Sequence, residues 1–97
     1  MTSRADRLQA QLTSAFSPTR LVVTDESARH VGHMGARPGG ETHYAIHLVS
    51  SLFEGKSRVA RHREVNALLA AEFAAGLHAL ALTLRTPAEE TAAASEG

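Results

Sequence analysis

The absence of cysteine is the feature that most constrains how this chain folds. Its 97 residues contain no thiol, so neither a disulfide nor a thiolate-bound metal can hold it together. It must therefore build a hydrophobic core, and 43% of its residues are apolar, which is ordinary for a soluble globular domain. We expect one domain over residues 1–90, with a short helix or turn starting at Thr86-Pro87. The Ala/Ser/Gly-rich end predicts a disordered tail over residues 91–97.

Apolar periodicity predicts two main helices and three strands. Helical spacing is found over residues 3–16 and over residues 57–75, the second stretch as one helix or as two pieces. Residues 20–25, 42–50 and 77–85 are typical of strands. The order helix–strand–strand–helix–strand predicts an α+β sandwich: a three-stranded mixed sheet with helices on one face. The first two strands are expected to pair antiparallel, and the third to lie parallel to a neighbour.

Several classes of function lack support in the sequence. No serine stands in a Gly-x-Ser-x-Gly turn, and Gly32-His-Met-Gly35 lacks the Gly-Lys-Ser/Thr ending of a phosphate-binding loop. We therefore expect no enzyme. No apolar run approaches the roughly 20 residues of a membrane helix, and the polar start is unlike a signal peptide. We expect a cytoplasmic protein, and the excess of arginine over lysine hints at a bacterial source.

Three histidines are the candidate metal ligands. His30 and His33 lie in the segment 26–40, which is rich in glycine and has no periodicity, and His78 lies at the start of the last strand. Segments longer than about 12 residues without secondary structure are uncommon in compact domains and are often functional. Imidazole binds zinc, copper, nickel and iron, and it replaces cysteine on one iron of Rieske clusters. A single histidine at a strand end is, however, more often structural.

The other histidines carry a weaker signal. His43 and His47 share one face of the second strand, and a metal site there is one interpretation. Exposed polar strand residues are the more ordinary interpretation for both. His62 stands between two arginines and is expected to be solvated.

A basic segment is the second candidate site. Residues 54–64 contain cations that are suited to phosphates, to glutathione carboxylates or to an acidic partner surface. A solvated helix face explains the same pattern, and the formal net charge of +0 argues against a general nucleic-acid binder. The candidate residues are Lys56, Arg58, Arg61, His62 and Arg63.

A series of short segments runs in a fixed order over about residues 4–90. The segments are Phe16-Ser-Pro18, Val23-Thr-Asp-Glu-Ser27 followed by His30, Glu41-Thr-His-Tyr44, Val49-Ser50, Phe53-Glu-Gly55, Val59-Ala-Arg-His-Arg63, Gly76-Leu-His-Ala-Leu80 and Thr86-Pro87. Together they resemble the BolA family. No single segment decides the resemblance; the ordered set is specific, including Arg-His-Arg and His-Ala-Leu at the right separation.

The resemblance implies a fold similar to class II KH domains and a role in iron–sulfur chemistry. BolA-like proteins associate with monothiol glutaredoxins around a shared [2Fe–2S] cluster, with glutathione as a further ligand. The resemblance makes His78 one ligand, and either His30 or His33 the second; the sequence leaves that choice open. Imidazole ligands imply a raised reduction potential and pH-sensitive binding, because the imidazole must be deprotonated.

The resemblance also leaves an alternative function open. Some family members are described as DNA-binding regulators of cell shape and stress genes. Under that hypothesis the basic segment from Lys56 to Arg63 contacts DNA. For the chain without a partner, a monomer and a weak homodimer are both compatible with the sequence.

Overall fold

A computed structural model describes residues 3–26 and 42–96 of the chain. The elements are α1 (Arg4–Phe16), β1 (Arg20–Asp25), β2 (His43–Val49), the 3-10 helix η2 (Ser51–Phe53), α2 (Arg58–Leu68), α3 (Ala70–Ala74), β3 (Ala79–Arg85) and α4 (Pro87–Glu96).

The three strands form one mixed sheet in the order β1-β2-β3. Strand β1 pairs antiparallel with β2, and β2 pairs parallel with β3. Val23 lies opposite Ile46, and Ile46 opposite Leu82, so one face of the sheet is apolar across all three strands. The predicted α+β class, the mixed sheet and the division of the long helix are confirmed. The likeness to class II KH domains stays a prediction.

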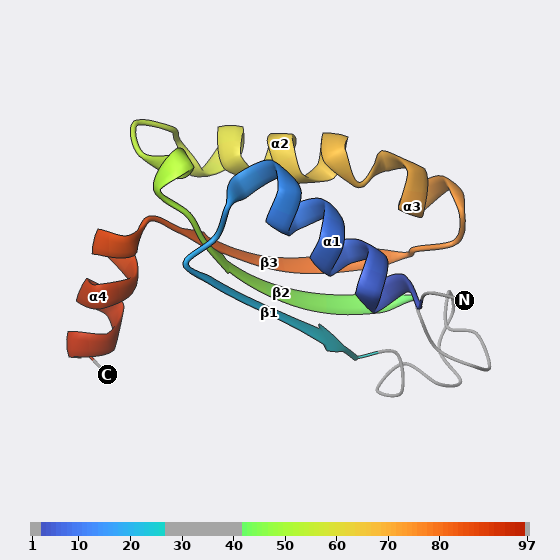
Figure 1. Cartoon of the computed structure of the whole chain (residues 1–97), viewed down its shortest axis with the longest axis horizontal. Helices are drawn as coiled ribbons and strands as arrows, with labels where there is room; N and C mark the ends of the chain where they lie inside the picture. The colour runs from blue at the N-terminus through green and yellow to red at the C-terminus, as the bar shows by residue number, and fades with distance from the viewer. Residues whose placement is uncertain (1–2, 27–41, 97) are drawn as a thin grey trace.

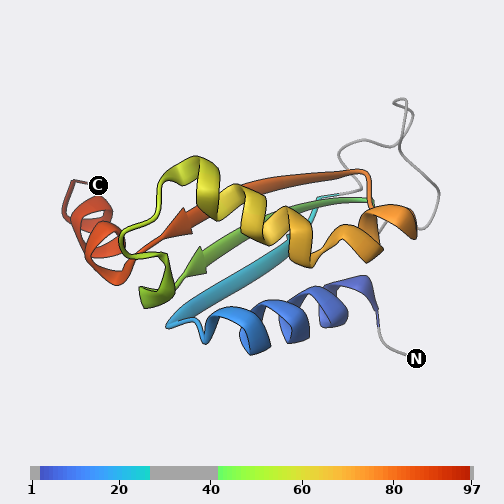
Figure 2. The same ribbon diagram turned by 90° about the horizontal axis from the view of Figure 1, so that it is seen from above.

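Helices α1, α2 and α3 cover this apolar face. Figures 1 and 2 show α1 beside the α2–α3 pair, with the sheet beneath them. The core therefore lies between the helices and one face of the sheet. Its buried side chains are Leu8, Leu12, Phe16, Tyr44, Ile46, Leu48, Phe53, Val65, Leu69, Leu77 and Leu84.

Helix α1 begins and ends at residues whose chemistry suits those positions. Ser3 accepts a hydrogen bond from the Asp6 amide, and the Asp6 carboxylate accepts one from the Ser3 amide, which makes a capping box. The helix ends at Ser17, whose φ of 43° lies in the left-handed region, and Pro18 prevents continuation.

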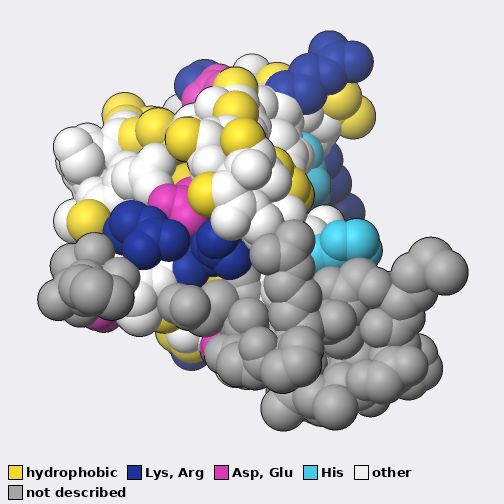
Figure 3. Space-filling model, turned by 90° about the vertical axis from the view of Figure 1, so that its right-hand side faces the viewer, with side chains coloured by type: hydrophobic (Ala, Val, Ile, Leu, Met, Phe, Trp, Pro, Cys, Tyr) yellow, Lys and Arg dark blue, Asp and Glu magenta, His cyan; other side chains and the backbone are white. Residues whose placement is uncertain are grey.

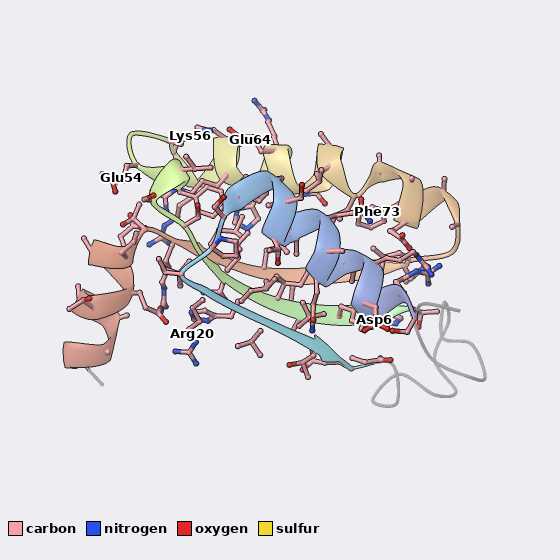
Figure 4. The ribbon with its side chains drawn as sticks, in the orientation of Figure 1. Asp6, Arg20, Glu54, Lys56, Glu64 and Phe73 are labelled. Carbon is pink, nitrogen blue, oxygen red and sulfur yellow. The ribbon has the colours of Figure 1, made fainter. Side chains whose placement is uncertain are left out.

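The short helix or turn predicted at Thr86-Pro87 is the helix α4, which continues into residues 91–96, where the sequence predicted a disordered tail. Helix α4 starts with reciprocal hydrogen bonds between Thr86 and Glu89. The Glu90 carboxylate then binds Arg20, His47 and Arg85. These three residues lie on the sheet face opposite the core, so α4 packs at one end of that open face (Figures 1 and 4).

A buried ion-pair cluster ties α1 to α3. Arg4 Nε donates to Glu72 Oε1 at 2.9 Å, and Arg7 Nε donates to Glu72 Oε2 at 2.8 Å. Arg4 also donates to the Ala75 carbonyl at 3.0 Å. The hydrogen bonds from Arg7 and Arg4 lower the pKa of Glu72 to about 2, although burial opposes this shift. The cluster therefore holds Glu72 as a carboxylate over nearly the whole pH range.

This cluster predicts a specific loss of stability in acid. The pKa of Glu72 is lower in the folded chain than in the unfolded chain, so its contribution is complete above about pH 4.5 and is lost as the pH falls toward 2. Urea unfolding across this range should show a steeper fall for the natural chain than for Glu72→Gln, which has no carboxylate there. Parallel pH profiles for the two proteins would contradict the assignment.

Candidate functional site

His78 stands at the end of the sheet where β2 and β3 both begin. The His78 and Ala79 amides both donate to the Thr42 carbonyl, at 2.8 and 3.0 Å. Thr42 itself is only 1% exposed, so this anchor is rigidly packed. The His78 side chain is exposed. The result is an accessible imidazole on a backbone that is fixed by a buried residue.

A second imidazole lies beside it. The ring centroids of His43 and His78 are 5.2 Å apart, and the ring planes are tilted by 48°. His43 is 9% exposed, and its Nδ1 shares a 2.9 Å hydrogen bond with Thr42 Oγ1. Thr42 thus holds both histidines, through its carbonyl for His78 and through its hydroxyl for His43. Figure 3 views the molecule from this side and shows histidine side chains at the surface.

His30 and His33 lie outside the described residues, so the structure places neither of them. The described chain stops at Glu26, after β1, and resumes at Thr42, before β2. The Glu26 amide donates to the His43 carbonyl at 2.8 Å, so both ends of this gap meet at the His78 end of the sheet.

Arg61, predicted as a contact for a partner or for DNA, is buried inside the protein. It is 5% exposed, and its guanidinium binds both oxygens of Glu89, at 2.6 and 3.2 Å. It also donates to the Leu84 and Lys56 carbonyls and lies 5.6 Å from the Phe53 ring centroid. Hydrogen bonds from Arg61 and from the Thr86 amide lower the pKa of Glu89 to about 2. Arg61 is therefore a structural residue that fastens α4 to α2 and β3.

In the rest of the basic segment, Lys56 forms an ion pair, while the two other arginines are exposed and form none with the described residues. Lys56 Nζ lies 2.6 Å from Glu64 Oε1, and Figure 4 shows the two side chains together above α2. His62 is half-buried, with Nδ1 2.8 Å from the Arg58 carbonyl. Arg58 and Arg63 are exposed and form no ion pair with the described residues. Of the five predicted contacts in the basic segment, Arg58, His62 and Arg63 therefore have no ion pair with the described residues.

Comparison with known proteins identifies the family of the chain. The family model described as BolA-like protein matches residues 12–89. The chain belongs to the BolA-like family. A Sinorhizobium relative named for its position in the cobS 5' region is 48% identical over 90 residues, which are 92% of this chain and 97% of that protein.

Solved BolA structures have the same fold as this BolA-like chain. BolA1 from Arabidopsis thaliana gives a TM-score of 0.82 at 39% identity, covering 92% of this chain and 98% of that one. The BolA domain of SufE1 from the same plant gives 0.80 at 42% identity, with the same coverage. The chain spans only 24% of the curated SufE-like protein 1, to which it is 43% identical over 90% of its own length.

The BolA-like chain also departs from two sequence expectations about histidines. His43 is buried, although we expected an exposed strand residue, because it packs against His78 and Thr42. His47 is half-buried and lies 2.9 Å from the Glu90 carboxylate. The parallel register, which puts His43 opposite Ala79, is the signal that relates His43 to His78, and it requires the strand pairing to be known.

The described residues alone do not make a complete metal site. No group of three or more His, Cys, Asp or Glu side chains among them is placed to hold a metal ion. Within the described ranges, no helix has the length and apolar character to cross a membrane.

Proposed function

We propose that this BolA-like chain is a non-enzymatic adaptor that shares a [2Fe–2S] cluster with a monothiol glutaredoxin in iron–sulfur cluster trafficking and iron homeostasis. The observation that carries the proposal is the exposed imidazole of His78, held by Thr42 at the sheet end where the segment with His30 and His33 begins and ends. Exposure matters because a cluster shared between two proteins needs ligands at the surface.

The donor chemistry fits this proposal. The chain offers imidazoles and no thiolate, and histidine is an established ligand to one iron of a [2Fe–2S] cluster. The glutaredoxin cysteine and the glutathione thiol would supply the other two ligands. His78 would be one ligand from this chain, and His30 or His33 the other.

Reconstitution of the cluster tests the proposal. The purified chain is mixed anaerobically with a monothiol glutaredoxin, glutathione, iron and sulfide, and is followed by visible circular dichroism and size-exclusion chromatography. We expect a heterodimer whose spectrum differs from that of the glutaredoxin homodimer. If the glutaredoxin keeps its own homodimeric cluster and no mixed species forms, the proposal fails.

The DNA-binding alternative loses part of its basis in this structure. Arg61 is buried and Lys56 is paired, which leaves few cations in the basic segment for phosphates. We therefore place the adaptor role first. Salt-dependent DNA binding by the natural chain, together with failure of the mixed cluster, would reverse this order.

A further inference from the structure

A groove runs along the outer edge of β3, at the opposite end of the strand from His78. It has a volume of about 500 Å³ and is bounded by α2 on the core side of the sheet and by α4 on the open side. Figure 2 shows β3 at the edge of the sheet, with α4 beyond its last residues. The lining residues are Arg58 and His62 from α2, Leu82 to Arg85 from β3, and Glu89, Ala92 and Ala93 from α4.

The floor of this groove is a strand edge with hydrogen-bonding capacity. Strand β3 has one neighbour strand, β2, in the described sheet. The Ala79 amide and the Arg85 carbonyl face β2, since they bond to the Thr42 carbonyl and the Ser50 amide. Alternate residues of a strand point their backbone groups to opposite sides. The amides and carbonyls of Leu82 and Leu84 therefore face outward, away from β2.

One of these outward groups already accepts a hydrogen bond from α2, which supports the assignment of these groups to the side away from β2. The Leu84 carbonyl accepts a 3.2 Å hydrogen bond from Arg61. The Leu82 amide and carbonyl and the Leu84 amide then remain on the side away from β2. This is the arrangement by which an edge strand accepts an added strand.

The walls of the groove differ in charge and size. On the α2 wall, Arg58 forms no ion pair with the described residues, and His62 lies one turn further along the helix. On the α4 wall, Glu89 is bound by Arg61, and the small side chains of Ala92 and Ala93 face the groove. An added strand alternates its side chains between these two walls. Acidic residues would then face α2, and small residues would face α4.

We propose that this groove binds an extended acidic segment of a partner protein, added as a strand to the edge of β3. The recognition pattern is an alternation of acidic and small side chains. Because the groove lies at the Arg85 end of β3 and His78 precedes its first residue, the groove is separate from the proposed cluster ligands. The inference does not depend on cluster sharing.

The test uses an acetylated hexapeptide that alternates glutamate and alanine, titrated into the full chain by amide NMR. We expect shifts at Leu82 and Leu84 and at the start of α2. Arg58→Glu should weaken binding about fivefold or more, because it removes an attractive charge and adds a repulsive one. Glutamate is favourable in the first turn of a helix, so this variant should fold.

Arg63→Glu is the matched control, because it makes the same charge change on α2 at a residue that does not line the groove. It should change the affinity by less than half as much. A second peptide, N-methylated at alternate amides, should lose binding because it cannot pair with β3. Equal binding by the N-methylated peptide, equal effects of the two variants, or stronger shifts of the same amides by a DNA duplex would overturn the proposal.

Discussion

Replacing Arg61 by alanine is expected to destabilise the fold by about 2–3 kcal/mol. The guanidinium binds two backbone carbonyls, of Leu84 and Lys56, and covers the ring of Phe53, which is fully buried. Alanine leaves the Leu84 carbonyl without its donor and opens the junction between α2, β3 and α4. Glu89 is half-exposed, so water replaces most of its lost pairing, and the cost comes mainly from the buried groups.

Arg63→Ala is the control for this prediction. Arg63 lies two residues away on the same helix, is exposed, and forms no ion pair with the described part of the chain. Its loss should change the free energy of unfolding by no more than about 0.5 kcal/mol. Urea unfolding of the two variants measures the difference. Equal stabilities of the two variants would contradict the structural role of Arg61. A loss of DNA or partner binding in Arg61→Ala counts as a loss of a contact only if the variant is folded under the conditions of the assay.

The largest functional effect is expected from His78→Ala. If His78 is a cluster ligand, its removal should lower the yield of mixed [2Fe–2S] cluster with the glutaredoxin by about tenfold or more. The fold should survive, because the side chain is exposed and the bond from the residue 78 amide to the Thr42 carbonyl needs no imidazole. The free energy of unfolding should stay within about 0.5 kcal/mol of the natural value.

His62→Ala is the control that distinguishes the loss of a cluster ligand from the loss of a histidine elsewhere in the chain. His62 lies on α2 beside Leu82 to Arg85, near the end of β3 that is opposite His78. The cluster yield should therefore be unchanged in this variant. Comparing His30→Ala with His33→Ala identifies the second ligand as the one whose loss lowers the yield more. A normal yield from His78→Ala would remove the central ligand from the account.

Much of the fold is predictable because local apolar patterns coincide with the final packing. Strand β1 has the predicted boundaries, and Tyr44, Ile46 and Leu48 form the buried face of β2 as their alternation indicates. The capping box at Ser3 likewise depends only on residues that are neighbours in sequence. Such features need no knowledge of distant contacts.

The features that the sequence alone does not reveal depend on partners far along the chain. Helix α4 lacks a clear apolar stripe; its ion pairs join Glu89 to Arg61 and Glu90 to Arg20, which are 28 and 70 residues apart. In the sequence, Arg61 is typical of a surface charge, because Glu89 and Leu84 contact it only in the folded chain. His43 likewise becomes a neighbour of His78 only through the pairing of β2 with β3.

The most direct test of cluster sharing is pulsed electron paramagnetic resonance on the reduced mixed cluster. Two histidine ligands should give nitrogen hyperfine couplings typical of imidazole bound to iron. Any mixed cluster that still forms with His78→Ala should lose one of these couplings, while His62→Ala should keep both. A mixed cluster without imidazole coupling, or one whose couplings persist unchanged in His78→Ala, would contradict the account.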